Sequence, residues 1–129
     1  MAFPGKRAGA APDAMAPDGS EVRILCGTAR GGMALFTLPA GAVSRAVAHR
    51  SIEEIWYFIA GRGRMWRKLG SEESVVAVEP GVSIALPTGT HFQFRNDGTE
   101  PLSAVGATMP PWPGEAEAYP VSGPWVATV

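Results

Sequence analysis

The sequence predicts a single domain built almost entirely from β-strands. The chain has 129 residues, a length typical of one domain with its own hydrophobic core. Glycine (16) and proline (12) make up more than a fifth of the chain, and they fall between short apolar runs. No stretch shows the spacing of an amphipathic helix. Short strands separated by frequent turns are typical of a β-sandwich or β-barrel.

About nine strands are expected, with turn signals roughly every 8–12 residues. The strongest is EIWYFIA at residues 54–60, which has four bulky or aromatic side chains and no strand breaker. The sequence Asn96-Asp97-Gly98 is a strong turn signal before the last strand. The expected strands cover residues 22–26, 33–38, 44–49, 54–60, 64–68, 75–78, 82–86, 92–95 and 102–108.

The two ends of the chain differ from this pattern. Residues 1–20 are small, contain proline and lack periodicity, so we expect a flexible N-terminal arm before a barrel domain at residues 21–129. The segment at about 109–129 has five prolines and cannot be a central strand. Its Trp112, Tyr119 and Trp125 predict that it packs on the barrel or on a partner subunit.

The composition narrows the possible roles. Hydrophobic residues make up 46% and charged residues 18%, as in ordinary globular proteins. A net charge of −1 gives no reason to expect a nucleic-acid partner. No apolar run approaches the roughly 18 residues of a membrane span, and no signal peptide is evident. With Cys26 as the single cysteine, a reducing, cytoplasmic location is expected.

Two segments of the sequence have residues at a distinctive spacing. The first runs from Gly41 through five residues to Val47, then His49, Glu54 and Gly61. The second runs from Gly81 through five residues to Pro87, then Gly89, Phe92 and Asn96. Together they resemble the two motifs of the cupin superfamily. The resemblance implies a jelly-roll (double-stranded β-helix) barrel that can hold a small ligand or a metal.

The resemblance also shows where this chain departs from the family. In metal-binding cupins, two histidines and the glutamate of the first motif, with the histidine of the second, ligate a divalent ion. Here Val47 and Phe92 stand at two of those four positions, and only His49 and Glu54 remain. Neither a valine nor a phenyl ring can ligate a metal, and two ligands rarely hold a catalytic ion.

His91 offers one way to restore a third ligand. If it turned inward, His49, Glu54 and His91 would form a two-histidine, one-carboxylate set suited to iron, manganese or zinc. Strand alternation favours the opposite face, because burying Phe92 and Phe94 stabilises by roughly 2 kcal/mol each. His91 could still face inward if it lies in the turn, so the cofactor is either a single divalent metal or none.

The remaining polar groups suggest the chemistry of the barrel interior. His49 and Glu54 are the candidate catalytic or ligand-binding residues, and aromatic neighbours should raise the pKa of Glu54 through desolvation. Alternatively, the two side chains simply pair with each other. The candidate ligand pocket consists of Trp56, Phe58, Phe92 and Phe94.

The favoured function is a cupin that binds a small organic molecule. If it is an enzyme, the resemblance implies isomerisation, cyclisation or dioxygenation of a metabolite. The alternatives are a metal-free binding or sensor protein and an accessory protein without catalysis. Apolar side chains on the outer face of one strand, Ile55, Tyr57 and Ile59, need a cover, so we expect a homodimer.

Overall fold

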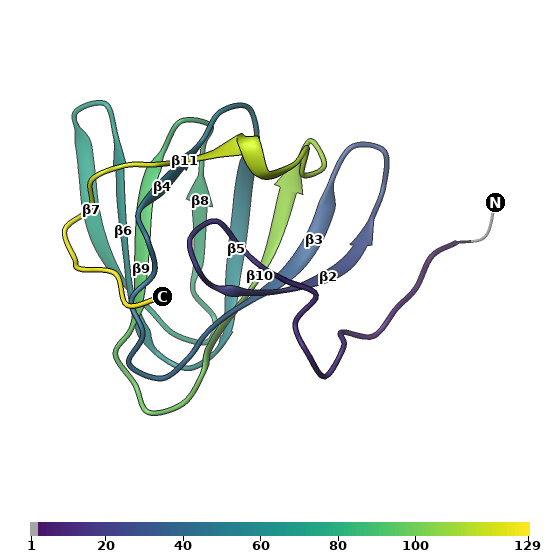
Figure 1. The fold of residues 1–129 in the computed structure, drawn as a ribbon, viewed down its shortest axis with the longest axis horizontal. Helices are drawn as coiled ribbons and strands as arrows, with labels where there is room; N and C mark the ends of the chain where they lie inside the picture. The colour runs from purple at the N-terminus through teal and green to yellow at the C-terminus, as the bar shows by residue number, and fades with distance from the viewer. Residues whose placement is uncertain (1–2) are drawn as a thin grey trace.

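The computed structural model describes residues 3–129, and Figure 1 shows them as a nearly all-β structure. A six-stranded sheet has the order β1-β2-β3-β10-β5-β8, and a five-stranded sheet has the order β11-β4-β9-β6-β7. The elements are β1 (Ala14–Met15), β2 (Glu21–Gly27), β3 (Gly32–Leu38), β4 (Val47–His49), β5 (Glu53–Ala60), β6 (Gly63–Leu69), β7 (Glu72–Val78), β8 (Ser83–Leu86), β9 (His91–Asn96), β10 (Leu102–Met109), the 3₁₀ helix η1 (Glu115–Glu117) and β11 (Ala118–Pro120).

All nine expected strands are present, and the jelly-roll prediction is confirmed. The largest differences in bounds are three residues each: β4 begins at Val47 rather than at Ser44, and β7 begins at Glu72 rather than at Val75. Residues 44–46 still run beside β9, where the Ser44 N–H donates to the Phe94 carbonyl (2.9 Å). The return bond from the Phe94 N–H goes to the Ser44 hydroxyl (3.0 Å) instead of a backbone carbonyl, so the ladder is interrupted there.

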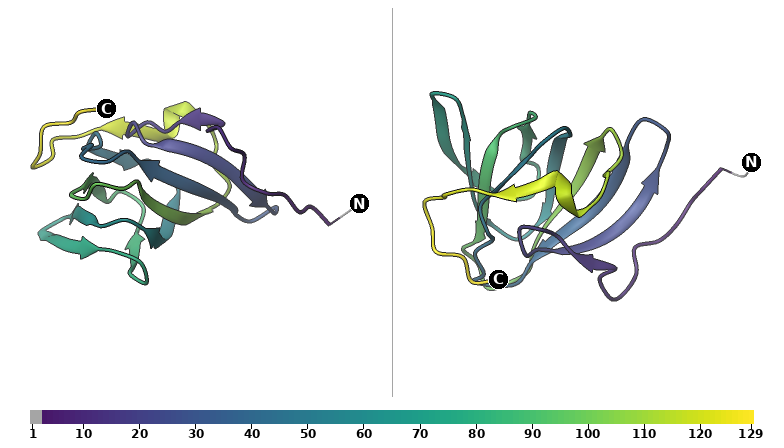
Figure 2. Two further views of the ribbon diagram at one scale, coloured as in Figure 1. Left: turned by 90° about the horizontal axis from the view of Figure 1, so that it is seen from below. Right: turned by 45° about the horizontal axis from the view of Figure 1, so that its top comes forward.

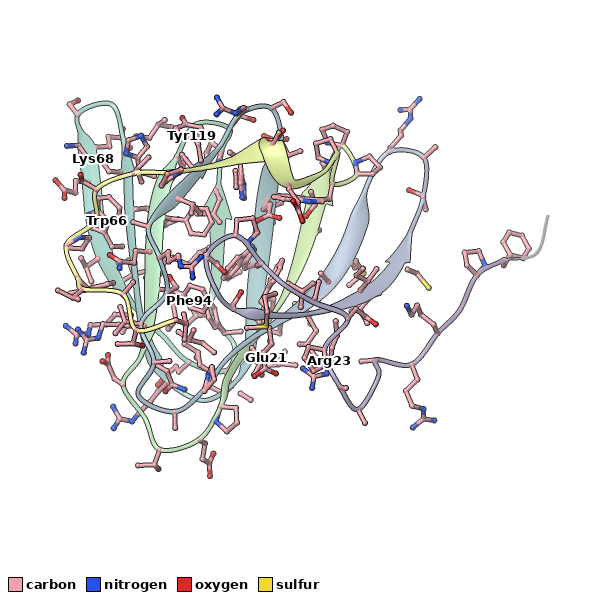
Figure 3. The ribbon with its side chains drawn as sticks, in the orientation of Figure 1. Glu21, Arg23, Trp66, Lys68, Phe94 and Tyr119 are labelled. Atoms are coloured by element: carbon pink, nitrogen blue, oxygen red, sulfur yellow. The ribbon has the colours of Figure 1, made fainter. Side chains whose placement is uncertain are left out.

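The alternation along β9 is as expected. Phe92 and Phe94 are almost fully buried and join the core between the two sheets, whereas His91 is only partly buried. Figure 3 places Phe94 in the interior and Lys68 at the outer end of its strand. Val47 and Phe92 are direct cross-strand partners, so the two apolar residues at the metal-ligand positions lie beside each other. The barrel interior is therefore apolar at two of the three positions where the family pattern has histidines.

The N-terminal segment is partly ordered on the barrel. Residues 14–15, within the segment predicted as a flexible arm, form β1 and pair with β2. A tight turn follows, in which Gly19 has a φ of +88° and the Ala16 N–H donates to the Ser20 carbonyl (2.8 Å). The side chains of Asp18 and Ser20 are buried. This segment therefore contributes to the interior of the protein.

The C-terminal segment packs on the barrel of its own chain. Figures 1 and 2 show it, in yellow, crossing the five-stranded sheet after β11 pairs with β4. Gln93 lies beneath it, and its amide donates to the Ser44 and Trp125 carbonyls at 2.8 and 2.9 Å. Gln93 belongs to the outer face of β9, as the alternation requires, yet the tail buries it almost completely.

The outer face of the six-stranded sheet carries an apolar patch, which we define as Ile55, Tyr57, Ile59, Val105 and Ala107. The first three residues are 52%, 51% and 47% exposed. Val105 and Ala107 on β10 are the cross-strand partners of Tyr57 and Ile55, so the patch spans two strands.

Within residues 3–129, no helix is long and apolar enough to cross a membrane.

Candidate functional site

A cavity of about 730 Å³ lies at one end of the barrel. Its volume falls within the range of small-molecule sites. The residues around it come from both ends of the chain as well as from the barrel strands, namely residues 14–18, β2, β3, β4, β5, β9, β10 and the segment that follows β10. Most of the lining is apolar, and its ionisable side chains are Asp18, His49, Glu54 and Glu115.

Glu54 is the buried carboxyl of this cavity. It is 3% exposed, and it points inward because residues 54, 56 and 58 share the inner face of β5. The Trp56 indole N–H donates to its Oε1 (3.1 Å), and the Thr108 hydroxyl donates to its Oε2 (2.6 Å). Thr108 is the cross-strand partner of Glu54 on β10. Burial raises the pKa of Glu54 to about 7, despite these two hydrogen bonds.

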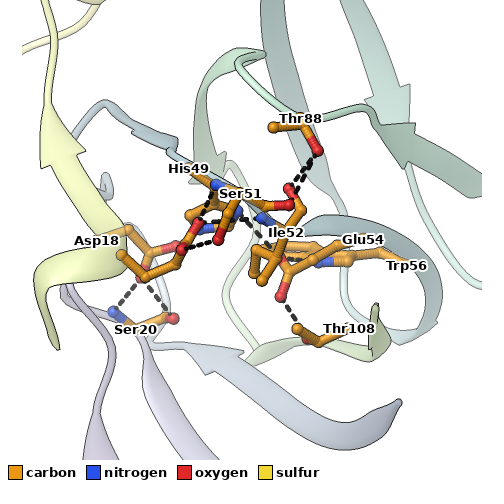
Figure 4. Close-up of polar contacts among 10 residues, drawn as sticks. Asp18, Ser20, His49, Ser51, Ile52, Glu54, Trp56, Thr88 and Thr108 are labelled. Atoms are coloured by element: carbon orange, nitrogen blue, oxygen red, sulfur yellow. Dashed lines mark hydrogen bonds and ion pairs between the residues drawn. The ribbon is translucent and has the colours of Figure 1, made fainter. Parts of the chain in front are cut away.

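His49, on β4, lies next to Glu54 in the cavity wall. Its Nδ1 lies 3.9 Å from Glu54 Oε1, which is longer than a hydrogen bond (Figure 4). The imidazole packs edge-on against Phe92 (5.3 Å between ring centres) and Trp112 (5.4 Å). Burial lowers the pKa of His49, although the nearby Glu117 opposes this. The site thus combines a neutral imidazole with a carboxyl that titrates near neutrality.

Glu117 on η1 supports this site from outside the cavity. Its Oε2 accepts hydrogen bonds from the N–H groups of Ser51 and Ile52 (2.7 and 3.1 Å), and the Ser51 hydroxyl donates to its Oε1. Burial alone would raise the pKa of Glu117, but these hydrogen bonds hold it below its usual range. The C-terminal segment therefore fixes the turn between His49 and Glu54.

The residues present do not fit a bound metal ion. Val47 and Phe92 fill two of the four positions at which the family pattern has ligands, which leaves only His49 and Glu54. His91 does not complete the set. It lies opposite Lys68 on β6, on the other face of β9 from Phe92, which contacts His49. Across residues 3–129, no group of three potential ligands is close enough to hold an ion.

The cavity includes two of the four residues of the predicted aromatic pocket. Trp56 and Phe92 line the cavity, but Phe58 and Phe94 do not. Phe58 and Phe94 pack against Trp56 at 6.1 and 5.2 Å between ring centres. All four side chains share the barrel interior, as alternation predicts, but the cavity occupies only one end of it. Trp56 and Phe92 differ from Phe58 and Phe94 in their depth along the barrel, which strand alternation does not specify.

Several cavity residues had no clear signal in the sequence. They are Asp18 in the turn after β1, Phe36 on β3, Thr108 on β10 and Trp112 after β10. The aromatic content of the tail predicted that Trp112 packs on the barrel or on a partner subunit, but not that it lines a cavity. Thr108 could have been found only from the register of β10 with β5, which places it opposite Glu54.

Gly106 makes room for the aromatic wall of the cavity. Phe36 and Trp56 stack with 4.7 Å between ring centres, beside this glycine on β10. A Cβ at position 106 would lie 2.5 Å from Phe36 Cε2 and 3.1 Å from Trp56 Cδ1. Both rings are held in the core, so neither can withdraw without disturbing its neighbours.

We therefore expect Gly106→Ala to lower the free energy of unfolding by about 2 kcal/mol, through overpacking. Urea denaturation would measure this change. Gly32→Ala is the matched control, because Gly32 is also a strand glycine and a Cβ there would meet nothing within 4 Å. Equal stabilities for the two variants would contradict the assigned role of Gly106.

The fold and the site together define a small β-barrel protein with a mostly apolar cavity at one end of the barrel. The model of the cupin domain family matches residues 34–107, more than half of the chain. The protein belongs to the cupin family.

Solved structures show the same fold at low sequence identity. An uncharacterised Klebsiella pneumoniae protein with a double-stranded β-helix domain is 17% identical, with a TM-score of 0.66, and the match covers 81% of this chain and 85% of that one. A Bacillus halodurans protein is 21% identical, with a TM-score of 0.65 and 73% coverage of both chains. Oxalate decarboxylase from Bacillus subtilis is 19% identical, with a TM-score of 0.67, over 79% of this chain and 28% of that enzyme. A search of curated proteins found no significant match.

Proposed function

We propose that this cupin binds a small, largely apolar organic molecule in the barrel cavity, with His49 and Glu54 as its polar anchors. The observation that carries the proposal is the cavity of about 730 Å³, which has these two buried polar side chains among its apolar and aromatic walls. An apolar pocket with a few convergent polar groups is the usual form of a small-molecule site. The unusual pKa of Glu54 is a further feature of functional sites.

The proposed binding does not require a metal. His49 and Glu54 alone are a poor ligand set, and the neighbouring Val47 and Phe92 present hydrocarbon to the bound molecule. A metal-free binding site therefore fits the residues better than a two-histidine, one-carboxylate centre.

The test begins with the untagged protein purified from cells. Native mass spectrometry would detect a bound organic molecule, and elemental analysis would measure transition metals. Returning the released molecule to the emptied protein should raise its thermal midpoint, since a ligand that binds only the folded state stabilises it. His49→Ala and Glu54→Gln should reduce that shift, whereas Glu53→Gln on the outer face of β5 should preserve it. A stoichiometric metal, or a shift that both cavity variants retain, would refute the proposal.

A second candidate function is proton transfer to or from the bound molecule, as in an isomerisation or cyclisation. It is favoured by a carboxyl with a pKa of about 7 beside a neutral imidazole at 3.9 Å. Incubating the recovered ligand with the protein in D₂O would reveal such a reaction as deuterium incorporation at carbon. Incorporation that Glu54→Gln abolishes supports catalysis, and unchanged ligand supports binding alone.

We also propose that the protein is a homodimer that buries the apolar patch of Ile55, Tyr57, Ile59, Val105 and Ala107. The outward positions of β5 and β10 from Ile55 to Ile59 and from Ser103 to Met109 carry no charged side chain. A second copy would present the same uncharged surface, so two patches can cover each other across a two-fold axis.

Light scattering should give a dimer mass for the wild type at micromolar concentration and a monomer mass for Tyr57→Lys. In the dimer, the ammonium group that this substitution introduces would be buried without a partner, which is strongly unfavourable. Val75→Lys is the control, since Val75 is 51% exposed on the other sheet and should not affect the mass. A monomeric wild type would refute the dimer.

A further inference from the structure

The ionisable side chains of the cavity are strongly biased toward acids. Three carboxyl groups line it, from Asp18, Glu54 and Glu115, and no lysine or arginine of the described chain does so. His49 is the only basic side chain in the lining, and burial lowers its pKa. A bound carboxylate or phosphate would meet no positive charge there, so the lining disfavours anionic ligands.

Two buried polar groups in the cavity have unused bonding capacity. His49 is 7% exposed, and no hydrogen bond reaches its imidazole from any residue in the described range. Asp18 is 3% exposed, and both hydrogen bonds that it accepts, from the N–H and the hydroxyl of Ser20, go to Oδ1. Neither group is among the fully buried side-chain atoms that lack a partner in residues 3–129, so their unused atoms are open to the cavity and accessible to a ligand that supplies donors.

The aromatic lining suits the same kind of ligand. Phe36 and Trp56 form a stacked pair, and Trp112 stands edge-on to His49 at the exposed side of the cavity. Aromatic faces attract cations and provide apolar contact, whereas they do not attract anions. Carboxyl groups combined with aromatic faces are a suitable environment for a protonated amine.

Resting on the proposed function, we infer that the ligand is an organic amine, whose ammonium group lies among Asp18, Glu54 and His49 and whose apolar body packs against Trp56. An ammonium carries up to three donors, which matches the free oxygen of Asp18, the Glu54 carboxyl and the unpartnered imidazole.

The charged groups around the cavity set the pH dependence of this binding. Burial raises the pKa of both Asp18 and Glu54, and each group favours its ionised form once a cation is bound. Glu115 lines the exposed side of the cavity. The charge of Glu117, on η1, acts to raise the pKa of both His49 and Glu54. The charge of Arg45 acts to lower the pKa of Asp18, although the Arg45 side chain makes its hydrogen bond to the Val129 carbonyl rather than to Asp18. Amine binding should therefore strengthen as the pH rises toward about 8.

Matched probes that differ only in charge would test the inference. The first set is tryptamine, tryptophol and indole-3-propionate, and the second is 2-phenylethylamine, 2-phenylethanol and 3-phenylpropionate. The indole N–H signals of Trp56 and Trp112 in NMR spectra report on the cavity. Those of Trp66 and Trp125, which do not line it, serve as internal controls.

At about pH 8, each amine should bind at least about tenfold more tightly than its alcohol, and each carboxylate should bind most weakly. Lowering the pH to about 5.5 should weaken the binding of the amines but not that of the other probes. Asp18→Asn and Glu54→Gln should each reduce the ratio of amine affinity to alcohol affinity, whereas Glu53→Gln on the outer face of β5 should leave that ratio unchanged.

The outcomes separate the inference from the proposed function. Carboxylates that bind as tightly as the amines would overturn the inference and leave small-molecule binding intact. A preference that survives in both Asp18→Asn and Glu54→Gln would also overturn it. If neither probe set shifts the Trp56 or Trp112 signals, the proposed function fails, and the inference fails with it.

Discussion

Glu54→Gln is expected to raise the free energy of unfolding by about 3 kcal/mol above pH 7, although it alters the centre of the proposed site. The folded protein holds the Glu54 proton up to about pH 7, whereas the unfolded chain releases it near 4.5. Between these values the unfolded state binds fewer protons than the folded state, so stability falls as the pH rises. Glutamine has no proton to lose, and its amide can preserve the contacts with Trp56 and Thr108.

Urea denaturation at several pH values between about 4 and 8.5 would measure the effect. The wild type and the variant should have similar stability near pH 4, diverge through the window from 4.5 to 7 and stay apart above it. Asp18, His49, Asp97 and Glu117 also have shifted pKa values and are present in both proteins. The contribution of Asp97, which does not act on Glu54, cancels in the difference, whereas Asp18, His49 and Glu117 lie near Glu54 and respond to its charge. Glu53→Gln provides the surface control. A constant difference across all pH values would show that Glu54 does not titrate near neutrality.

Trp56→Ala is expected to lower the free energy of unfolding by about 4 kcal/mol. Trp56 is almost fully buried, stacks on Phe36 and meets Phe92 and Phe94 edge-on at 5.9 and 5.2 Å between ring centres. Removing the indole leaves a void among these rings and also takes a hydrogen-bond donor from Glu54. Trp112→Ala is the matched control, because Trp112 is 40% exposed and should cost about 1 kcal/mol or less.

Trp56→Phe separates packing from hydrogen bonding at the same position. A phenyl ring fills most of the space, so the loss of stability should be about half that of Trp56→Ala. The indole N–H lowers the pKa of Glu54, and its loss should move that pKa upward from about 7. NMR titration of the Glu54 side-chain carbon would measure the shift. A Glu54 pKa that falls in Trp56→Phe would contradict the assigned hydrogen bond.

The sequence predicted most of the barrel, because its strands are bounded by strong local signals. Gly61 and Gly81 have positive φ values of +79° and +99°, and Gly61 follows β5, whose alternation marks a buried face. The inward orientation of Phe92 and Phe94 and the raised pKa of Glu54 were also predicted, since each depends on a strand period of two and on nearby apolar residues.

The predicted site was less complete, because a cavity is assembled from segments that are far apart in the chain. Asp18 and Trp112 are far apart in the sequence, with the strands from β2 to β10 between them, yet both line the cavity. Neither residue belongs to a spaced motif or to a strong strand. Local sequence patterns carry no information about which loops meet over the end of a barrel.

The sequence by itself determined the strand pattern, the cupin motifs and the replacement of two metal-ligand positions by Val47 and Phe92. These features follow from residue types and short-range spacing. The tertiary structure alone decided that Val47 and Phe92 are cross-strand partners, that Thr108 bonds to Glu54, and that the cavity excludes Phe58 and Phe94. The register between strands and the depth along the barrel settle these points, and both arise from packing of the whole chain.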